Sequence, residues 1–159
     1  MKSRIDHQRV APRAIQVMLC LQTYVNNSGL EHSLLELVKM RASQINGCGY
    51  CIDMHTKDAR AEGETEQRLY LLDAWREAPM YSARERAALE WTEAVTLVGE
   101  GHVSDAVYDA VREHFSEAEL VNLTLAVVAI NGWNRLSIAM RSVPGTYHAR
   151  QPASAAVPA

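Results

Sequence analysis

Two cysteines and a histidine fall within eight positions of the segment QINGCGYCIDMHTKDA, residues 44–59, in a chain with three cysteines in total. On a helix with 3.6 residues per turn, Cys48 and Cys51 are i, i+3 neighbours, and Cys51 and His55 are i, i+4 neighbours, so each pair can touch. Thiols beside a base or a second thiol act as nucleophiles, redox centres or metal ligands. The spacing leaves three interpretations: a redox pair, a metal site and ordinary core packing.

Cys48 stands at the expected start of a helix, directly after Gly47. Free backbone N–H groups and the helix dipole favour an anion there. Lowering a thiol pKa from about 8.5 to about 7 takes roughly 2 kcal/mol, whereas a helix terminus supplies about 0.3–1 kcal/mol. A second group is therefore needed, and His55 is the candidate base or imidazolium. The cluster favours redox chemistry over core packing, which we expect for the isolated Cys20.

A zinc site is the second chemical interpretation of the same residues. A C-x-x-C pair is half of a common zinc site, but the second pair of ligands is missing. The remaining cysteine is Cys20, and the other histidines lack ligand spacing: His7, His32, His102, His114 and His148. A metal would need a carboxylate or a neighbouring subunit. The sequence therefore predicts no metal and no bound cofactor other than a redox-active disulfide.

The composition is that of a single globular domain, with 159 residues, 48% hydrophobic and 22% charged. A formal charge of −3 offers no basic surface for nucleic acid. The apolar runs AIQVMLCLQTYV and LVNLTLAVVAI are interrupted by polar residues, and neither indicates a signal peptide or a membrane span. We expect a cytoplasmic protein, and in a reducing compartment a C-x-x-C pair is more often catalytic or metal-binding than structural.

Helical periodicity dominates the chain and predicts an all-α fold of about six to seven helices. Two capping boxes, Ser82 with Glu85 and Ser116 with Glu119, mark helix starts. Residues 1–143 are expected to form one helical domain, and residues 144–159 a flexible tail or an arm on a neighbouring subunit. The expected helices cover residues 10–27, 31–46, 48–63, 65–77, 82–98 and 104–115, with a long apolar one from 116 onward.

A short internal similarity links two parts of the chain. The sequence INGC at residues 45–48 recurs as INGW at residues 130–133, each after a long apolar helix. A duplication would predict a repeated unit of helix, Asn-Gly break and helix. If the two breaks meet in space, Trp133 lines the pocket of the cysteines.

These residues also carry a family resemblance. Glu36, eleven intervening residues, Cys48, Cys51 and, after three more, His55 resemble the E-x11-C-x-x-C-x3-H core of the AhpD-like alkylhydroperoxidases, within the carboxymuconolactone decarboxylase superfamily. The similarity continues through LVKMRASQINGCGYCIDMHTKDAR, GETEQRLYLLDAWREAPMY, RERAALEWTEAVT and LVNLTLAVVAINGWNRL, and so covers most of residues 12–141. It implies an AhpD-like helical bundle, a trimer or hexamer, and reduction of organic hydroperoxides by a disulfide cycle. Tyr50 stands where some AhpD-like enzymes have a second histidine.

The resemblance also implies roles for the motif residues. Cys51 would be the peroxidatic thiol and Cys48 the resolving thiol, while His55 and Glu36 would relay protons. The resulting Cys48–Cys51 disulfide would be reduced by an external dithiol or a thioredoxin-like protein. Helix position alone favours Cys48 as the more acidic thiol, whereas the resemblance and the reach of His55 favour Cys51 as the attacking one.

Periodicity and resemblance disagree about Glu36. On a helix over residues 31–46, Glu36 lies near Lys39 and Ser43 on the polar side, which predicts a solvated surface residue. Its expected role therefore rests on the resemblance, and it requires the next helix or a second subunit to cover that face.

Several functions remain open at this stage. The first is a thiol-dependent peroxidase that reduces organic hydroperoxides, and the second a general dithiol-disulfide oxidoreductase. The third is lactone decarboxylation, as the superfamily name suggests, although that chemistry does not need a C-x-x-C pair. The fourth is a non-enzymatic interaction or metal-binding module.

Overall fold

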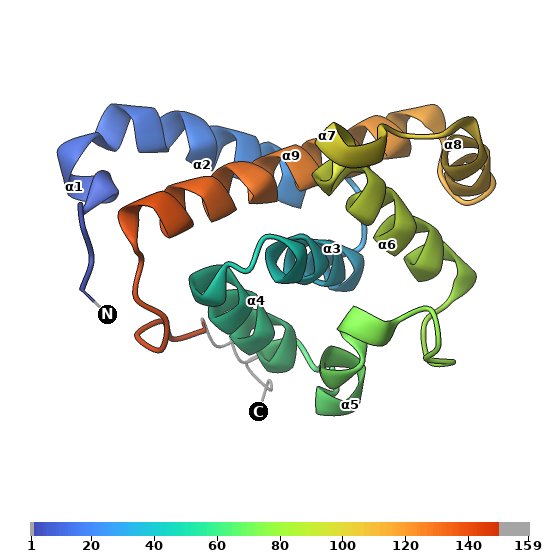
Figure 1. The fold of residues 1–159 in the computed structure, drawn as a ribbon, viewed down its shortest axis with the longest axis horizontal. Coiled ribbons are helices and arrows are strands. Elements are labelled where there is room, and N and C mark those ends of the chain that lie inside the picture. Colours follow the sequence, from blue (N-terminus) through green and yellow to red (C-terminus); the bar gives the residue numbers. More distant parts are fainter. Residues whose placement is uncertain (1, 150–159) are drawn as a thin grey trace, which may run out of the picture.

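The computed structural model describes residues 2–149, and the described part is all-helical, which confirms the expected fold class (Figure 1). It contains more helical pieces than the six to seven expected, because α1 and α7 are single turns of four residues. The elements are α1 (His7–Val10), α2 (Pro12–Asn26), α3 (His32–Ile45), α4 (Gly49–Ala61), α5 (Glu66–Tyr70), the 3-10 helix η1 (Leu72–Ala74), α6 (Ala83–Thr96), α7 (Val98–Gly101), α8 (Asp105–Arg112) and α9 (Glu117–Met140).

Helix α3 lies at the centre of the molecule, in contact with α4, α6 and α9, while α2 runs along α9 (Figure 1). Nine of the 14 residues of α3 are buried, including the charged Glu36 and Lys39. Its apolar residues Leu35 and Val38 join a core cluster with Trp91 of α6 and Leu123 of α9. Because α3 is enclosed on several sides, it can hold polar groups in the protein interior.

The capping signals read from the sequence are present. The hydroxyls of Ser82 and Ser116 each accept a hydrogen bond from the backbone N–H of the glutamate three residues later. The side chain of each glutamate in turn accepts a hydrogen bond from the backbone N–H of the serine. The hydroxyl of Ser104 accepts from the backbone N–H of Val107 at the start of α8. These bonds satisfy N–H groups that have no partner within the helix, so they fix where the helices begin.

The helix expected over residues 65–77 is divided into α5 and η1. Leu69, Leu72 and Trp75 all enter a second core cluster. Their spacing of three residues matches the 3-10 helix, in which side chains at i and i+3 point the same way. Tertiary packing therefore replaces the regular α-helix there.

The proposed second helix break does not exist, because α9 continues without interruption through Asn131 and Gly132. The two similar segments nevertheless meet: the side-chain amide of Asn46 donates to Oδ1 of Asn131 at 2.9 Å. Gly132 instead lies against α2, since a Cβ atom there would lie 2.8 Å from Cε of Met18 and the methionine side chain would have to shift.

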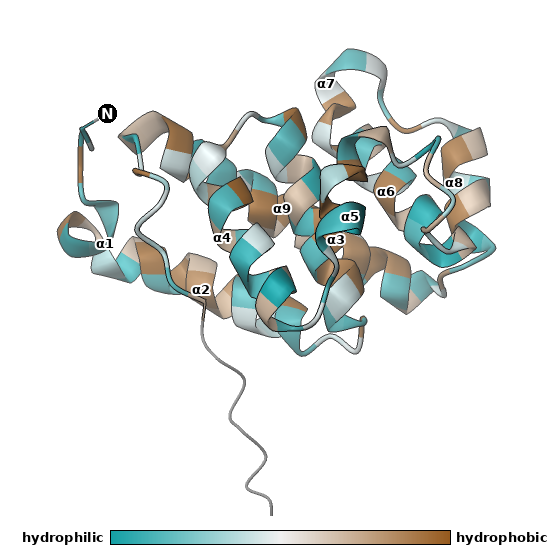
Figure 2. Cartoon of the chain, turned by 90° about the horizontal axis from the view of Figure 1, so that it is seen from below, coloured by the Kyte–Doolittle hydropathy of each residue, from teal (hydrophilic) through white to brown (hydrophobic). Residues whose placement is uncertain are grey.

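Helix α9 has 24 residues and is the one helix of the described part that is long and apolar enough to cross a membrane. The apolar run considered in the sequence is shorter than this helix. Figure 2 shows hydrophobic residues on α3 and α9 in the middle of the bundle, whereas α5 on the outside is hydrophilic. Leu123, Val127 and Ile130 are all buried against the rest of the protein. Core burial therefore accounts for the apolar character of α9.

After α9 the chain turns back and residues 143–148 lie against α4. The backbone N–H of Gly145 donates to Asp53 at 2.9 Å, and Lys57 donates to the carbonyl of Tyr147 at 3.0 Å. This part of the expected tail therefore packs on its own chain, because α4 offers polar partners for its backbone. Residues 150–159 lie outside the described part.

Candidate functional site

The joint between α3 and α4 places the first cysteine. Gly47 has a φ of 64°, a left-handed conformation that glycine adopts without cost. The N–H of Gly47 bonds to the carbonyl of Gln44 at 3.1 Å, and the N–H of Cys48 bonds to the carbonyl of Ser43 at 2.9 Å. This is the Schellman pattern that ends a helix. Cys48 is then the N-cap of α4, so one short turn closes α3 and opens the helix that carries the motif.

Cys48 and Cys51 are both free thiols and both 1% exposed. They form a small cluster with Ala42 and Ile130, against which Tyr50 and Trp133 pack. Trp133 thus packs beside the cysteines, although the second helix break on which its expected position depended is absent. The cover around the dithiol is apolar and aromatic.

The two thiols differ in acidity. The thiol of Cys51 hydrogen-bonds to Cys48, and this bond, with backbone N–H groups and the amide of Asn134, outweighs burial and lowers the pKa of Cys48 to about 6. The pKa of Cys51 is raised, because Cys51 is the donor to Cys48 and because it is buried. These hydrogen bonds favour the thiolate form of Cys48, the sulfur at the helix N-terminus, over that of Cys51.

Glu36 reaches the site from α3. Its Oε2 lies 2.8 Å from Nδ1 of His55, and its Oε1 accepts from Nζ of Lys39 at 2.7 Å. Burial raises the pKa of Glu36, but the hydrogen bond and charge of His55 and the charge of Lys39 outweigh it and lower that pKa to about 2. Glu36 is thus an ionised carboxylate in the protein interior.

The surface position that periodicity predicted for Glu36 is wrong, since this residue is 6% exposed. Helix α4 covers that face of α3, as a role for Glu36 would require, and brings His55 onto it. Lys39 and Ser43, on the same polar side, are also buried. A polar stripe on a helix indicates solvent only when no second helix supplies partners for it.

Cys51 and His55 lie one turn apart on α4, and both are buried. Among the described contacts His55 bonds to Glu36 rather than to Cys51, while the thiol of Cys51 lies 3.9 Å from Oγ of Ser137 on α9. The structure therefore brings all four motif residues to one buried region. It joins them as two pairs, a thiol pair and an acid-base pair.

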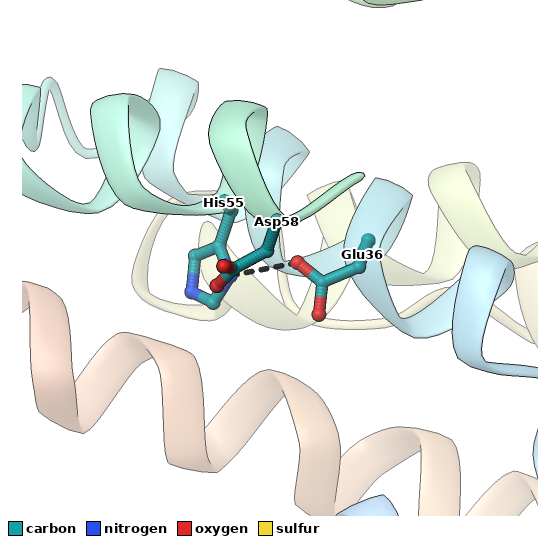
Figure 3. Close-up of side chains that lie close together, drawn as sticks. All are labelled: Glu36, His55 and Asp58. Carbon is teal, nitrogen blue, oxygen red and sulfur yellow. Dashed lines mark hydrogen bonds and ion pairs between the residues drawn. The ribbon is translucent and has the colours of Figure 1, made fainter. Parts of the chain in front are cut away.

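A third ionisable residue stands beside the acid-base pair. Figure 3 shows the carboxyl of Asp58 next to the imidazole of His55, and ligand atoms of Glu36, His55 and Asp58 all lie within 4.8 Å of one another. Such a spacing suits a metal ion, but Lys39 already neutralises Glu36, and the hydroxyl of Tyr147 donates to Asp58 at 2.7 Å. Each of the two carboxylates therefore has a hydrogen-bond partner of its own, and the cysteines do not belong to this group.

The cavity that adjoins Glu36 has a volume of about 550 Å³. It lies among α3, the end of α4, α5 and the start of α6, and neither cysteine lines it. Its wall carries the charged side chains Glu36, Glu62, Glu64, Arg68 and Glu85. Of the four motif residues, Glu36 alone lines this cavity.

Asn134, Ser137 and Asp58 are site residues that the sequence analysis did not single out. Asn134 is fully buried, donates to Oγ of Ser43 at 3.0 Å, and contributes to the acidity of Cys48. A usable signal existed, because an asparagine inside the apolar stretch of α9 must find buried hydrogen-bond partners. For Asp58 the sequence held no such signal, because a charged residue on a polar helix face is expected to be exposed to solvent.

Comparisons with known proteins agree with the fold and with the family resemblance. The profile of the carboxymuconolactone decarboxylase family matches residues 13–94. The uncharacterised protein YdfG of Bacillus subtilis is 47% identical over 140 residues, which is 88% of this chain and 95% of YdfG. The alkyl hydroperoxide reductase AhpD of Bradyrhizobium diazoefficiens is 40% identical over 45 residues, or 28% of this chain and 25% of AhpD.

A solved structure shows the same architecture. ATU0492 of Agrobacterium tumefaciens, a protein of unknown function described as a candidate AhpD antioxidant defence protein, superposes with a TM-score of 0.89 at 43% identity. The superposition covers 92% of this chain and all of that one. With the family profile matching more than half of its length, this chain belongs to the carboxymuconolactone decarboxylase family and has the AhpD-like helical fold.

Proposed function

We propose that this protein is a thiol-dependent peroxidase that reduces organic hydroperoxides through a Cys48–Cys51 disulfide. The observation that carries the proposal is the buried pair of free thiols at the start of α4, one hydrogen-bonded to the other, in the same buried region as the Glu36–His55 pair. A nucleophilic sulfur, a resolving sulfur and a proton-transfer pair are the groups that such a cycle needs.

In the proposed cycle, the Cys51 thiolate attacks the O–O bond and forms a sulfenic acid, while the alkoxide leaves and takes a proton to become the alcohol. His55, held by Glu36, supplies that proton. Cys48 then attacks the sulfenic sulfur, water leaves, and the Cys48–Cys51 disulfide forms. An external dithiol reduces the disulfide by exchange and returns the enzyme to its starting state.

The resting charge on Cys48 and the proposed attack by Cys51 are compatible. The thiol of Cys51 donates its hydrogen bond to the sulfur of Cys48, so one proton transfer within this bond moves the charge to Cys51. His55 lies one turn from Cys51 on the same helix, and both residues are buried. These features, together with the resemblance, support Cys51 as the peroxidatic residue.

A single-turnover experiment tests the proposal. Pre-reduced protein is mixed with one equivalent of cumene hydroperoxide, and peroxide loss and protein products are followed by mass spectrometry. We expect stoichiometric loss with a Cys48–Cys51 disulfide, a sulfenic acid on Cys51 in Cys48→Ser, and no reaction in Cys51→Ser. A sulfenic acid on Cys48 in Cys51→Ser would reverse the order, and no peroxide loss by the wild-type protein would reject the function.

A general dithiol-disulfide oxidoreductase is the second candidate, because the same acidic thiol pair would serve thiol exchange. Exchange with protein disulfides but not with hydroperoxide would identify it. Lactone decarboxylation is tested with the Cys48→Ala, Cys51→Ala double variant, which would keep that activity if the cysteines are not involved. The hydroperoxide, the thioredoxin-like reductant, the trimer or hexamer and the cytoplasmic location remain predictions from sequence and resemblance.

A further inference from the structure

Tyr147 connects the segment after α9 to the buried acid-base pair. Its hydroxyl donates to Oδ1 of Asp58 at 2.7 Å, and its carbonyl accepts from Lys57 at 3.0 Å. Two residues earlier in the segment, Gly145 bonds to Asp53 through its backbone N–H. The segment is therefore seated on α4 by three successive bonds, and one of them ends on the carboxyl beside His55.

The surroundings of His55 are charged on two sides. Glu36 and Lys39 face it from α3, and Asp58 stands beside it on α4 (Figure 3). From α9 the neighbouring polar group is the uncharged Ser137, which contacts Cys51. Lys57 is turned outward to Asp53 and to the segment after α9. On the side of α4, Asp58 is thus the charged group between His55 and the segment after α9, while on the side of α3 Glu36 lines the cavity with Glu62, Glu64, Arg68 and Glu85.

The acid-base pair is buried, but the proposed reaction exchanges a proton with solvent. His55 and Glu36 are each 6% exposed, whereas Asp58 and Tyr147 are half-buried. With one thiolate and one thiol at rest, the reaction is thiolate plus thiol plus hydroperoxide plus one proton, giving disulfide, alcohol and water. One proton must therefore enter the interior from solvent for each disulfide formed, and the reverse holds on reduction.

We propose that Asp58 transfers protons between solvent and the buried Glu36–His55 pair, and that the hydroxyl of Tyr147 holds the Asp58 carboxyl in place for this transfer. The inference rests on the proposed peroxidase function. Asp58 acts through His55 and does not touch the reacting sulfur, so both it and Tyr147 are positioning residues of the site. The segment after α9 is then a working part of the site.

The test compares Asp58→Asn with Asp53→Asn. Both remove one negative charge from α4 and keep the side-chain shape, and the amide oxygen introduced by Asp53→Asn can still accept from the backbone N–H of Gly145. Tyr147→Phe removes the hydroxyl alone, and Tyr70→Phe, whose hydroxyl bonds to the exposed Glu66, is its control. The readout is the rate of disulfide formation after mixing with cumene hydroperoxide, across the neutral pH range, with and without added formate.

We expect Asp58→Asn to slow disulfide formation by about 10- to 100-fold, which is less than the roughly 100- to 10,000-fold of direct acid-base catalysis because Asp58 acts through His55. Formate should restore part of the rate, because a small acid can carry the proton that Asp58 carried. Tyr147→Phe should slow the reaction by a smaller factor, while Asp53→Asn and Tyr70→Phe should behave like the wild type. Equal rates for Asp58→Asn and wild type, or an equal loss in Asp53→Asn without formate rescue, overturns the inference.

A second measurement separates this inference from the proposed function. If the wild-type protein forms no disulfide with hydroperoxide, the peroxidase proposal fails, and proton transfer is then measured without peroxide. A rapid pH jump changes the thiolate absorbance of the reduced protein in the ultraviolet. A slower change in Asp58→Asn than in Asp53→Asn supports the relay, and equal rates reject it.

Discussion

Cys48 and Cys51 are three residues apart in the sequence, yet their environments separate them. Cys48 receives hydrogen bonds at the helix N-terminus, whereas Cys51 donates its proton and faces the interior. The sequence predicted the acidic position of Cys48 from helix geometry alone. The i, i+3 spacing predicted that the two thiols can touch, but the sequence could not predict the contribution of Asn134, which reaches Cys48 from α9.

The first prediction concerns the titration of this pair. In reduced protein, thiolate absorbance should rise with a midpoint near pH 6, the pKa of Cys48. Cys51→Ala removes the strongest stabilising bond to the thiolate, so the midpoint should move up towards the ordinary thiol range of about 8.5. Cys20→Ala, on the exposed side of α2, serves as the control and should leave the midpoint unchanged. An unchanged midpoint in Cys51→Ala would contradict the assignment of the bond.

The second prediction concerns Glu36 and acid stability. Its pKa falls from an ordinary 4.5 to about 2 on folding, so the folded state favours the ionised form. Its contribution to stability is complete above about pH 4.5 and is lost as the pH falls towards 2. Glu36→Gln should therefore reduce the free energy of unfolding at neutral pH and flatten its dependence on pH in the acid range. Urea unfolding at several pH values measures this, and an equally steep dependence in the variant would contradict it.

At the level of elements, the short turn between α3 and α4 determines where Cys48 and Cys51 lie. Gly47 was recognisable in the sequence as the end of one helix, and the motif as the start of the next. The burial of Glu36 was not recognisable from periodicity, because α3 is packed on several sides and its polar stripe meets α4 rather than water. Hydrophobic periodicity predicts surfaces well for a helix with one buried face, as at α8, and less well for a central helix.

The third prediction tests that joint. Alanine at position 47 must adopt φ near 64°, which costs about 1–2 kcal/mol in free energy of unfolding and moves Cys48 from the helix terminus. Gly47→Asn should cost less, since asparagine tolerates this conformation. Gly99→Ala, in open space on α7, should be neutral or slightly stabilising. Thermal melts and single-turnover rates together measure both effects, and a fully stable, fully active Gly47→Ala would reject the role of the turn.

Across the whole molecule, Glu93 connects α6 to α3 and to the residues that follow η1. Its carboxylate accepts from Arg41 of α3 at 2.8 Å, from the indole of Trp75 at 2.7 Å and from Arg76 at 2.6 Å. None of these pairings is local in sequence, so they could not be predicted from the chain. The same holds for the contact of Tyr147 with Asp58, which joins residues 89 positions apart.

The fourth prediction follows from this connection. Glu93→Ala leaves three donors without their acceptor and should lower the free energy of unfolding by about 1–3 kcal/mol. Glu90→Ala removes an exposed carboxylate whose nearest pairing with Arg76 spans 3.7 Å, and should change stability by less than about 0.5 kcal/mol. Chemical denaturation of the two variants provides the comparison. Similar losses in both would show that Glu93 is no more than another surface charge.

The position of the cavity beside Glu36 has a consequence for inhibition. Because Glu36 lines the cavity and neither cysteine does, a small molecule bound there would act on Glu36 without covering the dithiol. Such a compound would disturb the Glu36–His55 pair and lower the maximal rate without competing with hydroperoxide. The compound should have no effect on a variant whose rate no longer depends on Glu36. A compound that reacts with the thiols should still inhibit such a variant.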